Sequence, residues 1–190
     1  MAGCRSLTEL ETVLVMDQLH SKRDQALFIL GLKTGYRISE LLSLKISDVY
    51  DSATSQVLAR IRVQKRNVKG KTASREVAVH PLAKEAILSL VQSHSTIDGA
   101  TFLFKSRNGV NEPISRHGAH KVLKQAYAAA GLSGSLATHT MRKTFAGKVY
   151  KALSHDLNAT KEALGHSSIL NTVKYLAVNQ DEIDQAVLSA

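Results

Sequence analysis

The stretch TGYRISELLSL, residues 34–44, predicts a corner between two helices. The apolar run before it, Ala26–Leu32, ends close to Gly35, and glycine readily takes the left-handed conformation that closes a helix. Beyond the glycine, Ile38–Leu44 again has the apolar spacing of a helix. We therefore expect Arg37 to lie at the corner itself.

Helices are predicted over most of the remaining chain. Thr8 and Glu11 have the spacing of a capping box, which predicts a first helix over Thr8–His20, and the helix that ends at Gly35 begins near Ser21. Apolar spacing and end signals predict further helices over Pro81–Val91, Ser115–Ala130, Thr140–Leu153, Ala159–Leu164, Ile169–Val178 and Asp181–Leu188.

Short strands are expected between the corner and Pro81. Residues 57–63 alternate between apolar and other side chains, as do residues 76–80, and the basic turn Gln64–Ser74 lies between them. Phe102–Phe104 is a further candidate strand. The predicted fold class is mainly α with one small antiparallel β-sheet (α+β), in a single domain over residues 1–190.

The charge balance favours a polyanionic partner. Among 190 residues there are 25 Lys plus Arg against 16 Asp plus Glu, a formal net charge of +9. Such an excess binds phosphates through charge neutralisation and counterion release. Trp is absent and aromatic residues make up 5% of the chain, so the stacking surfaces used on single strands are scarce. Contact with a duplex backbone is therefore preferred to binding of a single strand, although the charge alone names neither DNA nor RNA.

The N-terminal segment points to a reducing compartment. The single cysteine, Cys4, cannot form an internal disulfide, and no long apolar run marks a signal peptide or membrane span. We expect a cytoplasmic protein without a membrane partner. Cys4 is assigned no function.

Six residues that suit phosphate chemistry lie at predicted element ends or in loops: Arg37, Lys69, His139, Arg142, His166 and Tyr175. Each alone has an ordinary explanation, such as a surface ion pair or a capping histidine. Taken together they are more specific. His139 and Arg142 share one helical face at i, i+3, and His166 directly follows Gly165, a glycine expected to turn the chain at a helix end.

Four segments resemble the signature boxes of the tyrosine recombinase (phage integrase) family, in the family's chain order: TGYRISELLSL at 34–44, HTMR at 139–142, LGHSS at 164–168 and NTVKYL at 171–176. The resemblance implies that family's catalytic-domain fold. It also implies a site-specific recombinase or integrase that cuts and rejoins duplex DNA through a 3′-phosphotyrosyl intermediate, without metal or nucleotide cofactor. Integration or excision of a phage or mobile element is the process it suggests, and association with the nucleoid of a bacterial or phage-infected cell is the location.

The family's catalytic residues carry over one by one. Arg37 matches the first arginine, and His139 with Arg142 matches the His-x-x-Arg pair. His166 matches the second histidine and Tyr175 the nucleophile. Lys69 matches the hairpin lysine, with Lys71 as the alternative, and Glu40 resembles the acidic residue that supports the first arginine. The chain has Ala78 where the family often has proline, and Lys143 where it often has histidine.

Further basic residues are candidates for DNA contact: Lys65, Arg66, Lys71, Arg116, Lys121 and Lys143. Two other patterns are set aside. Gly70, Lys71 and Thr72 mimic the end of a P-loop, but the earlier glycine is missing and no helix follows. His117 and His120 share a helical face, yet no neighbouring carboxylate or cysteine completes a metal site.

Three other functions remain open from the sequence: a topoisomerase or telomere resolvase with the same chemistry, a silent DNA-binding regulator on the same fold, and a basic RNA-binding module. The family implies a homotetramer on synapsed DNA and a monomer or weak oligomer when free. It also implies an N-terminal DNA-clamp domain, which we expect to be absent from this chain. Gln180–Ala190 is expected to dock in cis or on a neighbouring protomer.

Overall fold

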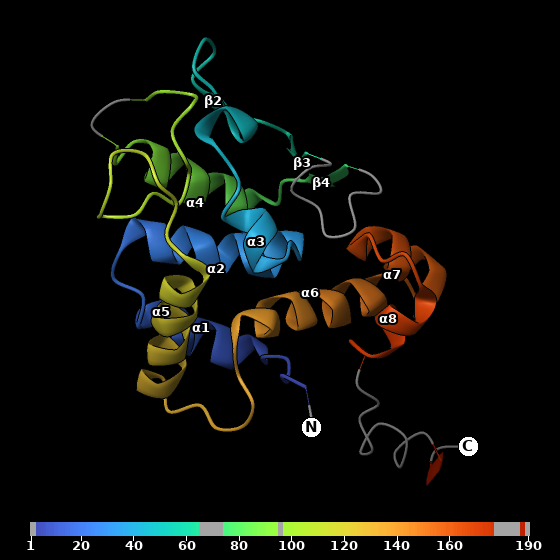
Figure 1. Cartoon of the computed structure of the whole chain (residues 1–190). Coiled ribbons are helices and arrows are strands. Elements are labelled where there is room, and N and C mark those ends of the chain that lie inside the picture. Colours follow the sequence, from blue (N-terminus) through green and yellow to red (C-terminus); the bar gives the residue numbers. More distant parts are fainter. Residues whose placement is uncertain (1–2, 65–73, 95–96, 177–186, 189–190) are drawn as a thin grey trace. The chain divides into compact units, whose positions relative to one another are not determined.

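The computed structural model describes residues 3–64, 74–94, 97–176 and 187–188 (Figure 1). The chain divides into two compact units, Met1–Phe145 (unit 1) and Ala146–Ala190 (unit 2), each of which is described by itself. Among the described residues, no helix is both long and apolar enough to cross a membrane.

Unit 1 is built on helix α2 (Lys22–Thr34), which runs through its middle (Figure 1). Its other helices are α1 (Glu9–Asp17), α3 (Ile38–Leu41), the short 3₁₀ helix η1 (Ile46–Asp48), α4 (Pro81–Val91), α5 (Arg116–Ala129) and the first half of α6 (Thr138–Ala152). Helix α2 packs against α3, α4 and α5. The core contains Leu27, Phe28, Leu30, Leu41, Ile46, Ile87, Phe104 and Tyr127, all almost completely buried.

Local signals explain where these helices begin and end. The Thr8–Glu11 capping box is present, with the Thr8 hydroxyl accepting from the Glu11 amide, and Ser21 caps α2. Gly35 ends α2 in the left-handed conformation, with φ of 59°. These predictions are confirmed. Helix α3 ends at Leu41, three residues before the predicted end at Leu44. The Leu44 carbonyl instead accepts a hydrogen bond from the amide of Leu103, which is distant in the sequence.

Among the described residues, the strands form two small antiparallel pairs, where the sequence predicted a single sheet. β1 (Tyr50–Asp51) pairs with β2 (Gln56–Val57), and β3 (Arg60–Val63) pairs with β4 (Arg75–Ala78). The predicted strand over 57–63 is thus divided between two partners. The predicted strand Phe102–Phe104 is wrong: only an isolated bridge joins Lys45 to Phe102, while Leu103 and Phe104 are buried as a loop that covers the core.

Unit 2 contains the second half of α6, then α7 (Leu157–Leu164) and α8 (Ile169–Val173). Gly165 ends α7 in the left-handed conformation, with φ of 61°, and Ser168 caps α8. Both α7 and α8 match predicted helices, although α8 ends before Tyr175 and not at the predicted Val178. Most of the predicted helix Asp181–Leu188 lies outside the described residues.

Candidate active site

The Arg37 corner is held by a buried carboxylate. Arg37 precedes α3, and its backbone amide donates to Glu40 Oε2 at 2.7 Å while its guanidinium NH1 donates to Glu40 Oε1 at 2.8 Å. Glu40 is fully buried, whereas the Arg37 side chain stays partly exposed. A carboxylate that grips both the backbone and the side chain leaves the guanidinium little rotational freedom. This is the contact through which Glu40 was expected to support Arg37.

Arg142 reaches the same corner from α6. Its side chain is 1% exposed, and its NH1 donates to the carbonyl oxygen of Gly35. The carbonyls at the C-terminal end of a helix lack partners within the helix and carry partial negative charge, so a guanidinium is favoured there. Two of the predicted arginines, Arg37 and Arg142, therefore flank one turn of backbone, although they lie more than a hundred residues apart in sequence.

Gly35 is required at this corner for two reasons. Its positive φ disfavours other residues, and a Cβ at this position would lie 2.2 Å from the Phe145 ring. The neighbouring Tyr36 is buried, and its hydroxyl donates to the carbonyls of Ile61 and Arg75 at 2.8 and 3.2 Å. Burial raises the pKa of Tyr36, so it stays a neutral structural donor. The corner is rigid because backbone and side chains hold it together.

His139 lies three residues before Arg142 on α6 and is exposed. Between them, Thr140 is fully buried, and its hydroxyl accepts from the Ala137 amide near the start of the helix. The i, i+3 arrangement that the sequence predicted is therefore present. It sets an accessible imidazole on the helix that carries the buried guanidinium.

His166 and Tyr175 come together within unit 2. The chain leaves α7 at Gly165, and the His166 amide donates to the Lys161 carbonyl at 3.1 Å, which turns the imidazole off the helix end. His166 is 6% exposed, and its ring lies 5.1 Å from the Tyr175 ring, centroid to centroid, at a tilt of 48°. The second histidine box and the tyrosine box thus meet.

Thr172 links these two residues and was missed by the sequence analysis. Its hydroxyl oxygen lies 3.0 Å from His166 Nδ1, and its carbonyl accepts from the Tyr175 amide at 2.9 Å. Thr172 is fully buried. Its position three residues before the tyrosine was the one available signal, because i, i+3 neighbours on a helical turn lie on one face.

The remaining predicted residues are distributed as follows. Lys65, Arg66, Lys69 and Lys71 lie outside the described residues. Arg116 and Lys121 are exposed on α5, and Lys143 is half-buried on α6. In the part of the chain that the structure describes, no group of three His, Cys, Asp or Glu residues could hold a metal ion, and His117 with His120 does not form such a group.

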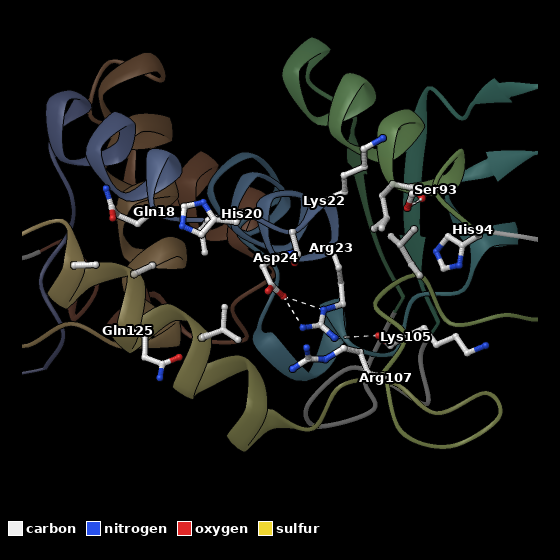
Figure 2. Close-up of a pocket in the computed structure, with 17 residues that line it drawn as sticks. Gln18, His20, Lys22, Arg23, Asp24, Ser93, His94, Lys105, Arg107 and Gln125 are labelled. Atoms are coloured by element: carbon white, nitrogen blue, oxygen red, sulfur yellow. Dashed lines mark hydrogen bonds and ion pairs between the residues drawn. The ribbon is translucent and has the colours of Figure 1, made fainter.

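A cavity of about 830 Å³ lies in unit 1 (Figure 2). Its rim is basic, with Lys22, Arg23, Lys105 and Arg107, and Leu19, Leu90 and Leu103 contribute apolar lining. Arg23 is engaged within it, by Asp24 at 2.9 Å and by the Lys105 carbonyl at 3.2 Å (Figure 2). Three of the predicted catalytic residues, Arg37, His139 and Arg142, lie in the described part of unit 1, and none of these three lines the cavity.

A smaller hollow of about 560 Å³ lies beside α3 and the start of α5. Ser39, Ser43 and Lys45 line one side, and Ser115 and Arg116 line another. Arg116 is one of the residues that the sequence predicts to contact DNA.

The chain is similar to known proteins over most of its length. The chain is 30% identical over 177 residues to the probable integrase/recombinase YoeC of Bacillus subtilis (strain 168), covering 93% of this chain and 90% of that protein. It is 33% identical over 162 residues to tyrosine recombinase XerC of Neisseria meningitidis serogroup B (strain MC58), covering 85% of this chain and 50% of XerC. The chain thus spans nearly all of the first relative and about half of the second.

Solved structures show the same fold. The XerA recombinase superposes with a TM-score of 0.77 at 23% identity, over 98% of this chain and 64% of that one. A lambda integrase dimer bound to a COC′ core site gives 0.69 at 20% identity, over 92% and 48%. The model of the phage integrase family matches residues 5–182. The chain therefore belongs to the phage integrase family, the tyrosine recombinases.

Proposed function

We propose that this chain is the catalytic domain of a site-specific recombinase that cuts and rejoins duplex DNA with Tyr175 as nucleophile. The observation that carries the proposal is the pair formed by the buried His166 ring and Tyr175, 5.1 Å apart, with Thr172 holding both. A tyrosine beside an oriented imidazole suits attack on a phosphodiester. The names of relatives, such as tyrosine recombinase XerC, support the same reaction.

The chemistry assigns one task to each residue. The Tyr175 oxygen attacks the scissile phosphorus, the bond to the 5′ oxygen breaks, and a 3′-phosphotyrosyl bond forms. His139 takes the phenol proton as general base, and Lys69, or Lys71 in its place, gives a proton to the departing 5′ oxygen. Rejoining reverses these steps with a 5′ hydroxyl as nucleophile, so the phosphotyrosyl bond conserves the energy and no cofactor is required.

The arginines stabilise charge during the displacement. Arg37 and Arg142 bind non-bridging phosphate oxygens with planar guanidinium forks, and His166 adds a hydrogen bond. Removing one such preorganised donor typically costs roughly a hundredfold to a thousandfold in rate. The contacts of Arg37 with Glu40 and of Arg142 with Gly35 support this role, because they fix both side chains before DNA binds.

The physiological process and assembly are part of the proposal. We propose integration or excision of a phage or mobile element by a homotetramer on synapsed DNA. Of this, the names of the relatives, which include a probable integrase/recombinase, support only recombination and integration. We propose that residues 1–190 act as a single catalytic domain in association with the nucleoid.

A strand-exchange assay tests the function. Nicked duplexes with a randomised centre are incubated with the chain, and covalent complexes are isolated under denaturing conditions and sequenced to give a working site. Two duplexes of different length carrying that site are then mixed with the chain. Recombinant strands support a recombinase. Relaxation of a supercoiled plasmid without recombinant strands indicates a topoisomerase, and binding without any covalent complex indicates a silent regulator.

A further inference from the structure

We propose that Arg75 is a positioning residue that holds the corner from which Arg37 acts. The inference rests on the proposed function, because it concerns the same strand cleavage. Arg75 is the first residue of β4, opposite Val63 of β3, and its side chain is 8% exposed. It does not reach the phosphate in this proposal and acts only through its neighbours.

Arg75 grips the residues on both sides of Gly35. Its NH2 donates to the Thr34 carbonyl at 2.7 Å, and its guanidinium lies over the Tyr36 ring, 4.7 Å from the centroid. The Tyr36 hydroxyl in turn donates to the Arg75 carbonyl at 3.2 Å. The planar guanidinium can stack on the Tyr36 ring and donate to the Thr34 carbonyl at the same time, so it holds both residues in place. A lysine ammonium is not planar and cannot do both.

Two buried guanidiniums therefore share the end of α2. Arg75 binds the carbonyl of Thr34, and Arg142 binds the next carbonyl, that of Gly35. Each neutralises part of the negative end of the helix. The chain continues directly through Tyr36 to Arg37, so any movement of these carbonyls moves the backbone that carries the Arg37 side chain.

Groups near the Arg37 corner also affect the pKa of Arg75. Burial lowers the pKa of Arg75, and the charge of Arg37 adds to that lowering, whereas Tyr36 and Glu40 oppose it. An arginine remains protonated under these conditions. Arg75 thus belongs to one electrostatic cluster with Arg37 and Glu40, in addition to its contacts with Thr34 and Tyr36.

The first test is kinetic. Arg75→Met and Arg75→Lys are compared with Arg60→Met, which removes an exposed arginine on β3 that pairs with Glu76. The substrate is the nicked duplex selected by the wild-type chain. We expect Arg75→Met to slow single-turnover covalent cleavage by roughly a hundredfold, as for a misplacement of about 1 Å. DNA affinity should change little, Arg75→Lys should not restore the rate, and Arg60→Met should cleave at nearly the wild-type rate.

A double-mutant cycle separates positioning from general loss of structure. If Arg75 acts through Arg37, then Arg75→Met should slow cleavage only slightly further in a chain that already carries Arg37→Ala. A variant that is merely unfolded in part loses the same factor in both backgrounds. Equal slowing in the two backgrounds, or no slowing by Arg75→Met in the wild-type background, would overturn the proposal.

The second test needs no DNA. Hydrogen exchange is measured for peptides that contain Tyr36 and Arg37, whose amides donate to Thr34 Oγ1 and Glu40 Oε2. Arg75→Met should speed their exchange by about tenfold or more while Arg60→Met leaves it unchanged. Unchanged exchange in Arg75→Met would show that Arg75 does not hold the corner. If the wild-type chain forms no covalent complex at all, the proposed function fails. Hydrogen exchange alone then still tests whether Arg75 holds the corner in place.

Discussion

The Thr172 hydroxyl oxygen lies 3.0 Å from His166 Nδ1, and both side chains are buried in unit 2. The same threonine accepts the Tyr175 amide on its carbonyl. One residue therefore sets the direction of the imidazole and the turn of backbone that carries the tyrosine. Such outer contacts commonly decide whether a reacting group is correctly aimed.

Thr172→Val keeps the shape of the side chain but removes the hydroxyl. We expect it to slow covalent cleavage on the order of tenfold to a hundredfold, by analogy with the loss of contacts that orient metal-binding histidines. Thr172→Ser, which keeps the hydroxyl, should cleave at close to the wild-type rate. Single-turnover assays on the selected duplex measure both. Equal rates for the valine and serine variants would show that the hydroxyl does not orient His166.

Gly35→Ala tests the corner itself. The added Cβ meets the Phe145 ring at 2.2 Å and also strains the left-handed backbone, so we expect a loss of about 2 kcal/mol or more in the free energy of unfolding. Gly131→Ala is the matched control, because it has a similar φ of 71° but nothing within 4 Å of the new Cβ. It should lose only about 1 kcal/mol. Urea unfolding compares them, and equal losses would exclude the Phe145 clash.

The identity of the proton-donating lysine is tested with a modified leaving group. A sulfur in place of the bridging 5′ oxygen leaves as a thiolate and does not need a proton. Lys69→Ala should therefore cleave ordinary DNA slowly and the sulfur-containing duplex at close to the wild-type rate. Lys71→Ala should show no such selective recovery. Recovery in Lys71→Ala alone would transfer the role to Lys71.

The lowered pKa of His94 predicts that the stability of unit 1 depends on pH. Burial and the nearby Lys105 charge lower its pKa, and its Nε2 is buried without a hydrogen-bond partner among the described residues. Below about pH 6.5 the unfolded chain binds a proton that the folded chain resists, so the free energy of unfolding falls as the pH drops from there towards the lowered pKa.

His94→Gln should remove that part of the fall. Urea unfolding at pH 7.5 and pH 5.5 compares it with the wild-type chain and with His120→Gln, which removes an exposed histidine on α5. An unchanged pH dependence in His94→Gln would show that His94 does not contribute.

Capping and glycine signals in the local sequence predicted much of the Arg37 corner and of the segment around His166. Gly35 and Gly165 both end helices in the left-handed conformation, and Thr8 with Glu11 forms the predicted cap. These features depend on residues within one turn of each other, so the sequence contains all the partners. The membership of His139 and Arg142 in one helix was predicted for the same reason.

Features that depend on distant partners were not predicted. Arg75 was not singled out, because its proposed role depends on contacts with Thr34 and Tyr36. These residues lie about forty positions earlier in the sequence, so local spacing does not reveal the contacts. The strand predicted at Phe102–Phe104 fails similarly, since Leu103 and Phe104 are buried by packing in the core and not by pairing with a neighbouring strand. Spacing along the chain shows which residues are apolar but not which distant segment covers them.

The measurement that tests the central claim most directly is identification of the residue that becomes joined to DNA. The chain is trapped on the selected nicked duplex with the label on the strand 5′ to the scissile phosphate, digested with protease, and analysed by mass spectrometry. Tyr175→Phe is compared with Tyr150→Phe, which removes a tyrosine hydroxyl from α6 whose ring packs on His155. We predict a labelled adduct on the Tyr175 peptide, present in wild type and Tyr150→Phe and absent in Tyr175→Phe. An adduct on another residue, or one that persists in Tyr175→Phe, would contradict the assignment of Tyr175 as the nucleophile.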